Sequence, residues 1–311
     1  MKTSVGICTY NRAHVLQTLD SIINQKTDSI AIHEIIVVDN DINRSAESII
    51  LKTAERTSIP IVYIHEPQKN IAAARNRILD AATGDWLALL DDDEVANPDW
   101  LAKFISIAQS NSSIAYFGPV ISRYAAHCPQ WISQGKFFCR KSYSTNVTVQ
   151  TGCTANAFIN LQAINAINHR FELTYGLTGG EDSHFFYQLY KTGNMLTWCK
   201  DAIVSEEVEA HRLNEQFLMK KSQRIGETYS RYRYKLMSTH DRAGYIAKSL
   251  VICSIGSCIS FLFWPFQSNV NAKIFMMRFK LRAADAKGKL KGISGGNLIE
   301  LYGADRAESR V

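Results

Sequence analysis

The chain contains a run of four consecutive carboxylates, Asp91 to Glu94, which directly follows the apolar stretch Trp86 to Leu90. The stretch has the length and character of a buried strand, so it predicts a strand that ends in the acids. Like charges this close repel one another, and a cation is one way to gather them. Because open α/β sheets bind ligands at the carboxyl ends of their strands, the pattern predicts a Mg²⁺ or Mn²⁺ site that holds a phosphate-bearing substrate. The alternative is a solvated loop, in which the negative charge of Asp93 or Glu94 stabilises the positive N-terminal end of the next helix.

Two other groups of acids are placed where chemistry is plausible. Glu181 and Asp182 follow Gly179-Gly180 and begin a helical apolar pattern. One of these carboxylates, in a partly dry cleft, could act as a general base toward an attacking hydroxyl, or both could simply cap the helix. Asp39 ends an apolar strand, where it could accept hydrogen bonds from a base or ribose, or cap a turn or helix.

The elements that must position these acids alternate regularly over the first 95 residues. Apolar runs predict strands at 5–9, 34–39, 61–65 and 86–90. Helical spacing predicts helices between them: one through 16–23 that follows a turn at 10–13, and two more at 45–57 and 70–82. This alternation indicates βαβ units and a parallel sheet. Neither Gly-x-x-x-x-Gly-Lys nor Gly-x-Gly-x-x-Gly follows the first strand. A diphosphate would therefore need a metal as its main counter-charge.

The next part of the chain is less regular. The pattern predicts a helix at 100–107 and a strand at 115–121, and 122–150 reads as loop-rich. The small residues of 151–158 form a turn that enters an apolar strand, which is the kind of backbone a substrate can approach closely.

Composition is that of an ordinary globular protein with an uneven charge. Residues 1–211 carry 17 Lys and Arg against 22 Asp and Glu, whereas residues 212–291 carry 16 against 4. A basic segment on an acidic body predicts an anionic partner for that segment. The seven cysteines are scattered without a Cys-x-x-Cys pair, which predicts reduced thiols and a cytosolic setting. No long apolar region precedes the first strand, so we expect no signal peptide.

An apolar stretch at 249–266 interrupts the basic segment for eighteen residues without a charge. As a helix it would be about 27 Å long, at the short end for a bilayer crossing. Basic residues flank it on both sides, and a full span would place one basic cluster on the outer face. We therefore expect a re-entrant or interfacial element at the cytoplasmic leaflet, with a buried helical hairpin as the alternative. No nucleic-acid-binding motif accompanies the basic residues, so we expect no nucleic acid partner.

Five motifs in a fixed order carry a resemblance to a known family. They are Gly6-Ile-Cys-Thr-Tyr-Asn-Arg12, Val38-Asp-Asn-Asp41, Asn70-Ile-Ala-Ala-Ala-Arg-Asn76, Thr83-Gly-Asp-Trp-Leu-Ala-Leu-Leu-Asp-Asp-Asp-Glu94 and Gly179-Gly-Glu-Asp-Ser-His-Phe-Phe186. Together they resemble the family 2 glycosyltransferases of the GT-A fold, an α/β fold with a mainly parallel central sheet flanked by helices. Within that family they resemble the bacterial exopolysaccharide glucosyltransferases of the ExoM type, from succinoglycan assembly.

The resemblance implies a nucleotide-sugar donor, expected to be a UDP-sugar. It implies that Thr9 and Asn11 line the nucleotide pocket, that Asp39 holds the uracil or ribose, and that Arg75 contacts the donor phosphate or sugar. It makes the acids Asp91, Asp92 and Asp93 the DxD-type element that binds donor and metal, with Asp93 the first choice for a direct metal ligand.

The resemblance also implies that Asp182 is the base and Glu181 an acceptor or sugar contact. Relatives often place a histidine, as a third metal ligand, shortly after the strand that follows the acidic helix. Here that place reads Val204-Ser-Glu-Glu207, and the nearest histidine is His211. Either His211 or Glu206 takes the role, or water does, and a surface histidine is the alternative for His211.

The implied organisation is a nucleotide-sugar-binding half at 1–95, an acceptor-binding half of the same domain at 96–211, and a basic helical segment at 212–311. The implied activity is inverting transfer of a hexose, with glucose favoured, to a growing lipid-linked oligosaccharide at the cytoplasmic face of the bacterial inner membrane. A metal-dependent nucleotidyltransferase or phosphohydrolase is an alternative, but it would be expected to carry a phosphate loop after the first strand. A non-catalytic nucleotide-sugar-binding protein is disfavoured because both the metal and the base motifs are present.

Overall fold

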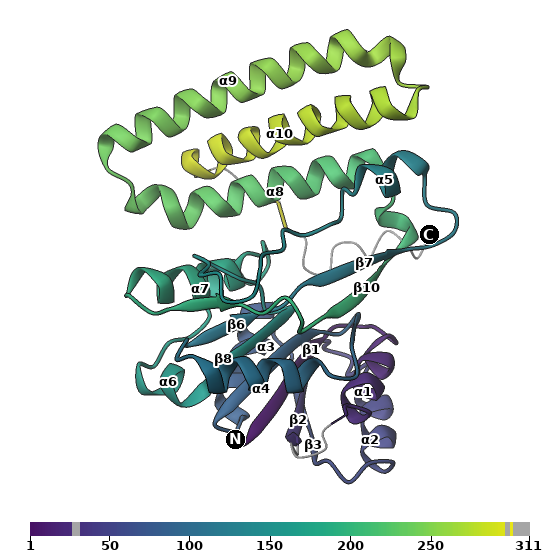
Figure 1. Cartoon of the computed structure of the whole chain (residues 1–311), viewed down its shortest axis with the longest axis vertical. Coiled ribbons are helices and arrows are strands. Elements are labelled where there is room, and N and C mark those ends of the chain that lie inside the picture. The colour runs from purple at the N-terminus through teal and green to yellow at the C-terminus, as the bar shows by residue number, and fades with distance from the viewer. Residues whose placement is uncertain (27–31, 296–298, 301–311) are drawn as a thin grey trace. The chain divides into compact units, whose positions relative to one another are not determined.

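The computed structural model describes residues 1–26, 32–295 and 299–300, which form two compact units. Among the described residues, the first unit comprises Met1–Arg123 and Cys139–Glu207, and the second comprises Tyr124–Phe138 and the part of the chain within Val208–Leu301. Figure 1 shows the first unit as a layered α/β body and the second as a stack of long helices.

A seven-stranded sheet with the order β3-β2-β1-β4-β8-β6-β9 forms the centre of the first unit. Its strands are β1 (Thr3–Thr9), β2 (Ile32–Asp39), β3 (Ile61–His65), β4 (Trp86–Asp91), β6 (Ala115–Phe117), β8 (Asn156–Asn160) and β9 (Leu196–Trp198). The pairs β1·β2, β1·β4, β2·β3 and β6·β9 are parallel, and β8 is antiparallel to both of its neighbours. Only β8 therefore runs against the others, and the prediction of a mainly parallel sheet is confirmed.

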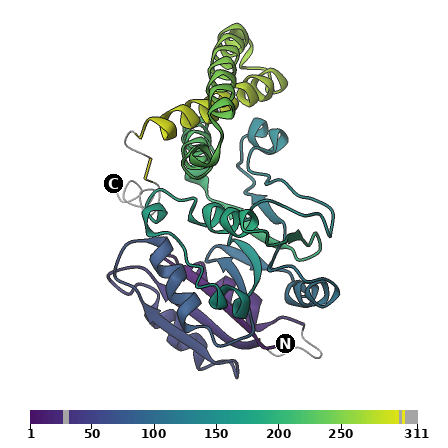
Figure 2. The same ribbon diagram turned by 90° about the vertical axis from the view of Figure 1, so that its left-hand side faces the viewer.

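Helices cover both faces of this sheet, as Figure 2 shows. Within β2, Ile35 and Val37 belong to one apolar cluster, whereas Ile36 and Val38 belong to the other, because successive strand side chains point to opposite faces. The first face carries α1 (Val15–Ile23), α2 (Glu47–Ala54) and α4 (Trp100–Ser110). The second face carries α3 (Ile71–Ala81), α6 (Leu161–Ala166) and α7 (Glu181–Lys191), with the short 3-10 helix η1 (Leu173–Tyr175) beside α3. This buried sheet explains why its strands read as continuous apolar runs.

A second sheet, with the order β5-β10-β7, corrects one prediction. Its strands are β5 (Glu94–Ala96), β7 (Val120–Tyr124) and β10 (Val204–Val208). The single strand predicted at 115–121 is wrong, because β6 and β7 are separate strands in different sheets. The chain turns at Gly118, where a Cβ would lie 1.9 Å from the carbonyl oxygen of Ala202. Only glycine can fit there, and the following proline cannot donate to a ladder.

The second unit is helical, with α8 (Glu215–Arg233), α9 (Thr239–Phe263) and α10 (Val270–Ser294) as its long elements. Its short elements are α5 (Gln130–Gly135), η2 (Ala210–Arg212), η3 (Tyr234–Leu236) and η4 (Trp264–Phe266). In this unit α10 packs against both α8 and α9. Gly288 of α10 permits this packing, because a Cβ there would lie 1.9 Å from the carbonyl oxygen of Gln223. The predicted helical C-terminal segment is confirmed, and its apolar stretch falls in α9 and η4.

Candidate active site

The carboxyl ends of β2, β1 and β4 bring the predicted donor residues to one edge of the sheet. In the parallel registers, Thr9 is opposite Asp39 and Cys8 is opposite Asp91. The Thr9 hydroxyl donates to Asp92 Oδ2 over 2.8 Å. The acidic run and the end of the first strand are therefore in direct contact, as expected from neighbouring strands in a parallel sheet.

Arg12 supplies a positive charge to the acidic run. Its Nη1 donates to Asp92 Oδ1 over 2.8 Å and to Asp93 Oδ2 over 2.6 Å. Asn11, just before it, has a φ of 51° and turns the chain as it leaves β1. Burial raises the pKa of the Asp92 carboxyl and Arg12 opposes that shift. No role was predicted for Arg12. It lies in the turn after β1, and β1 pairs with β4 in the sheet, so a parallel pairing of these two strands would have placed Arg12 near the acids that follow β4.

Arg75 connects the acidic run to the start of α7. From α3 its Nη1 donates to Glu181, and its Nη2 lies 3.3 Å from Asp91 Oδ1. Both Arg75 and Glu181 are buried. Gly180, with a φ of 89°, makes the left-handed turn that begins α7 and presents Glu181 to Arg75. One guanidinium thus holds together two acidic groups that are 90 residues apart in sequence.

Asp182 follows Glu181 on α7 and is partly exposed. Its Oδ1 accepts from the backbone N–H of Ser183 over 2.5 Å, and the Thr151 hydroxyl donates to the carbonyl of Ser183 over 2.9 Å. Burial raises the pKa of the Cys153 thiol, and the charges of Asp182 and Asp91 raise it further against the opposing effect of Arg140. Asp182 and Asp91 therefore both lie within electrostatic range of one thiol.

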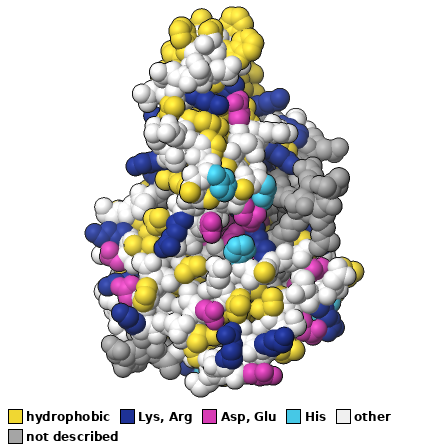
Figure 3. All heavy atoms as spheres, turned by 90° about the vertical axis from the view of Figure 1, so that its right-hand side faces the viewer, with side chains coloured by type: hydrophobic (Ala, Val, Ile, Leu, Met, Phe, Trp, Pro, Cys, Tyr) yellow, Lys and Arg dark blue, Asp and Glu magenta, His cyan; other side chains and the backbone are white. Residues whose placement is uncertain are grey.

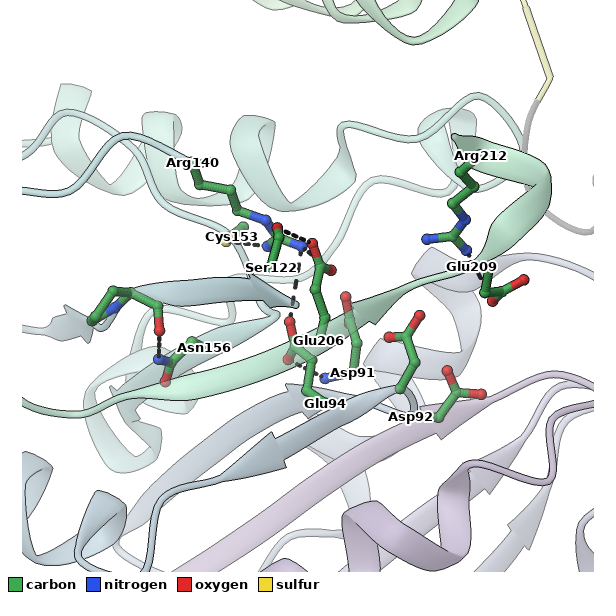
Figure 4. A network of polar contacts seen from close by, with 12 residues as sticks. Asp91, Asp92, Glu94, Ser122, Arg140, Cys153, Asn156, Glu206, Glu209 and Arg212 are labelled. Atoms are coloured by element: carbon green, nitrogen blue, oxygen red, sulfur yellow. Dashed lines mark hydrogen bonds and ion pairs between the residues drawn. The ribbon is translucent and has the colours of Figure 1, made fainter. Parts of the chain in front are cut away.

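A third arginine, Arg140, lies over the small sheet, and Figure 4 shows it between two glutamates. Its Nη2 lies 2.9 Å from Glu206 Oε2 and 3.8 Å from Glu94 Oε1. The backbone N–H of Asp91 donates to Glu94 Oε2 over 3.0 Å. Burial and the charge of Asp91 raise the pKa of Glu94 well above its usual value. Arg140 was not predicted, because it lies in the 122–150 stretch whose sequence carries no periodic signal.

Two of the residues implied by the resemblance have other partners in this structure. Asp39 is fully buried and accepts hydrogen bonds from the Ala46 N–H (2.9 Å), the Asp41 N–H (3.1 Å) and the Tyr63 hydroxyl (3.2 Å). These are the contacts of a turn cap, the alternative kept for it above. His211 belongs to the second unit, where its Nδ1 lies 3.1 Å from Glu209 Oε2.

A metal site at the acidic run requires several of these side chains to lie close together. Among the described residues, no three His, Cys, Asp or Glu side chains gather closely enough to hold a metal ion. Arg12 binds Asp92 and Asp93 while Arg75 binds Asp91, so the acids expected to hold a cation are paired with guanidinium groups. The donor set nevertheless fits a hard divalent cation in kind, since carboxylate oxygens are the ligands that Mg²⁺ and Mn²⁺ prefer.

One protein family and several known proteins match this chain in sequence. The model of "Glycosyl transferase family 2" matches residues 4–166. The succinoglycan biosynthesis protein ExoM of Rhizobium meliloti (strain 1021) is 32% identical over 98% of this chain and 97% of its own. Escherichia coli chondroitin synthase is 33% identical over 37% of this chain and 17% of its own.

Solved structures share the fold. A mannosyltransferase from Pyrobaculum calidifontis, in complex with GDP-Man and Mn²⁺, aligns with a TM-score of 0.64 at 15% identity over 95% of this chain and 88% of its own. S. aureus TarS 1-349 in complex with UDP-GlcNAc aligns with a TM-score of 0.54 at 16% identity over 95% and 92%. The predicted GT-A fold is therefore confirmed.

Proposed function

Because the chain belongs to glycosyl transferase family 2, we propose that it is an inverting hexosyltransferase of bacterial exopolysaccharide biosynthesis. The donor is a UDP-sugar, with glucose as the favoured hexose, and the acceptor is a growing oligosaccharide linked to a lipid. The similarity to ExoM over nearly the whole length of both chains supports this process. A TarS structure with UDP-GlcNAc and the same fold supports a UDP-sugar donor.

The observation that carries the proposal is the bridge made by Arg75. The guanidinium joins Asp91, at the proposed donor site, to Glu181, next to the proposed base. A guanidinium is only a few ångströms across, so the two groups of acids border one site. A hexose bound at that site could therefore contact both groups.

Each side chain then has a role in the proposed reaction. Asp91 and Asp93 would hold Mg²⁺ or Mn²⁺, which when bound neutralises charge on the diphosphate. Thr9 and Asn11 would line the nucleotide pocket, with Asp92 beside Thr9. Asp39 would hold the uracil or ribose in addition to its turn contacts. Arg75 would contact the donor phosphate or sugar.

Asp182 would act as the base of a single displacement. Its carboxylate takes the proton of the acceptor hydroxyl while the hydroxyl oxygen forms a bond to the anomeric carbon. The bond from that carbon to the diphosphate oxygen breaks, and its electron pair leaves with UDP. Attack from the opposite face inverts the anomeric centre, so an α-linked donor gives a β-linked product. Glu181, fixed by Arg75, would contact the sugar or the acceptor.

The helical unit supports a position at the cytoplasmic leaflet of the inner membrane. Among the described residues one helix, Thr239–Phe266, is long and apolar enough to cross a membrane, with a mean hydropathy of 1.9 over its most apolar window. In Figure 3 apolar side chains gather at the end of the helical unit, and Lys and Arg side chains lie below them. The large exposed apolar residues of this region are Leu250, Val251, Ile255, Phe261, Leu262, Trp264 and Phe266.

The packing of α9 favours a peripheral or re-entrant position over a span. Cys253 contacts the carbonyl of Ala283, and the rings of Phe263 and Phe275 lie 4.8 Å apart, so α9 is antiparallel to α10 along much of its length. A spanning α9 would draw the basic side chains of α10 into the bilayer, where each charge is costly. An in-plane helix keeps them at the anionic head groups.

A donor panel tests the proposal. The purified protein is incubated with Mn²⁺, one radiolabelled UDP-sugar at a time, and a lipid extract that contains lipid-linked oligosaccharide. We expect label to move into the lipid fraction with one hexose, and expect none without lipid acceptor. Release of UDP without transfer would instead indicate a phosphohydrolase, and donor binding without turnover would indicate a binding protein.

A further inference from the structure

The helical unit contains a groove that the proposed reaction does not use. It has a volume of about 680 Å³ and lies among residues of α8, α9 and α10, including Met219, Lys220, Cys253, Ser257 and Lys287. This volume is within the range of about 300–1,000 Å³ that is typical of small-molecule sites.

Two lysines, Lys220 and Lys287, border the groove, and neither has an acidic partner among the described residues. Other lysines of α10 are paired: Lys280 with Glu215 over 2.7 Å, Lys289 with Asp285 over 2.7 Å, and Lys291 with Glu227 over 3.1 Å. No carboxylate of the described residues forms an ion pair with Lys220 or Lys287. Gln216 and Gln223 add amide groups to the same lining, and one N–H of the Gln223 amide donates to Glu227 Oε1 over 3.0 Å, which leaves its second N–H for a ligand. The groove therefore offers two cations and neutral donors to an anion.

The apolar side of the groove continues into the exposed face of α9. Cys253 and Ser257 line the groove, and they lie on one helical stripe with Leu250 and Phe261, at spacings of three, four and four residues. Leu250 is 52% exposed and Phe261 is 77% exposed. A ligand with its anionic end at the lysines could extend an apolar chain along this stripe.

From this juxtaposition we propose that the groove binds the diphosphate end of a membrane lipid, with the lipid chain along the Leu250–Phe261 stripe of α9. The inference deepens the proposed function and rests on it in one respect, namely that the lipid is the carrier of the acceptor. Two lysines and two amides suit a head group with two phosphates, because each ammonium donates three hydrogen bonds. The chain end needs apolar surface that is open to the bilayer, which α9 provides.

The test uses the full chain and four soluble probes: farnesyl diphosphate, inorganic diphosphate, farnesol and dihexanoyl phosphatidic acid. Binding is measured by calorimetry in EDTA without nucleotide, so that no metal assists the binding of a diphosphate at the proposed donor site. We expect farnesyl diphosphate to bind with a stoichiometry of one, and each other probe to bind at least about tenfold more weakly, because each lacks part of the recognised chemistry.

Two variants locate the binding. Lys220→Gln with Lys287→Gln should weaken farnesyl diphosphate binding about tenfold or more, by loss of charge-assisted hydrogen bonds. Ser257→Trp should weaken it by filling the groove without a change of charge. Lys52→Gln with Lys248→Gln removes the same charge elsewhere and should leave the affinity unchanged. Circular dichroism checks that each variant is folded.

Five results would overturn the assignment. These are no binding of farnesyl diphosphate, equal binding of inorganic diphosphate, equal binding of farnesol, equal binding of dihexanoyl phosphatidic acid, and unchanged affinity in both groove variants. The proposed function fails separately, since loss of sugar transfer in every donor and acceptor combination would leave the farnesyl diphosphate titration unaffected.

Discussion

Replacing Arg12 by glutamine tests whether the acidic run is built for a divalent cation. Arg12 Nη1 lies 2.8 Å from Asp92 and 2.6 Å from Asp93, and the three side chains are 18%, 7% and 12% exposed. In Arg12→Gln without metal, two nearly buried carboxylates lose their counter-charge. We expect this variant to be less stable than the wild type in EDTA, and to bind Mn²⁺ more tightly without nucleotide, because no guanidinium has to be displaced.

The expected loss of stability in Arg12→Gln follows from the burial of the Asp92 and Asp93 side chains. Removing one partner of a buried ion pair costs about 3–5 kcal/mol of unfolding free energy. The Thr9 hydroxyl still donates to Asp92 over 2.8 Å, so the lower end, about 3 kcal/mol, is expected. At roughly 2–3 °C per kcal/mol, the melting temperature in EDTA falls by about 6–9 °C. Mn²⁺ at a hundred times its dissociation constant adds about 2.7 kcal/mol and should restore most of the loss.

Thermal unfolding in EDTA and in Mn²⁺, with electron paramagnetic resonance of free Mn²⁺, measures both effects. Arg56→Gln is the matched control, because Arg56 lies 3.6 Å from Asp20 and both side chains are exposed, at 59% and 49%. An exposed pair contributes less than about 1 kcal/mol, so the control should melt near the wild type with or without metal. If Mn²⁺ shifted all three proteins equally, the competition between Arg12 and a cation would be refuted.

Three further predictions concern catalysis, metal dependence and pH. Asp182→Asn should lower kcat by about 10²–10⁴-fold while UDP-sugar affinity changes little, which kinetics and equilibrium binding would separate. Chelation with EDTA should abolish transfer, and added Mn²⁺ or Mg²⁺ should restore it. Burial raises the pKa of Glu34, but hydrogen bonds from Ser4 and Thr83 outweigh it and leave the folded pKa lowered from its usual 4.5. Glu34 therefore stabilises the fold above about pH 4.5 and loses this effect as the pH falls through the folded pKa. Glu34→Gln should lower the free energy of unfolding by about 2 kcal/mol at pH 7. Denaturant titration should show that this difference from the wild type shrinks as the pH is lowered.

The first half of the fold was predictable because its strands are buried on both faces and its helices are regularly spaced. The prediction for β3 matches the structure at both ends, and α3 begins one residue after its cap, Asn70, whose side chain accepts from the Ala73 N–H. The failure at 115–121 has a local and a tertiary cause. The Gly118-Pro119 pair inside the apolar run was a local signal of a break, and the approach of the Ala202 carbonyl shows why the chain changes sheet there.

In the candidate site, the positions of the acids could be predicted from the local sequence, whereas their arginine partners were harder to predict. A carboxylate at the end of an apolar strand is visible in the local sequence, as with Asp91, because strand and acid are adjacent. The partner of each acid is distant: Arg12 is 80 residues from Asp92, Glu181 is 106 from Arg75, and Arg140 is 66 from Glu206. Such pairs depend on strand order and on irregular segments that no periodicity marks. The acidic clusters suggest cation binding, but the folded chain meets that demand with its own guanidinium groups, and any metal has to compete with them.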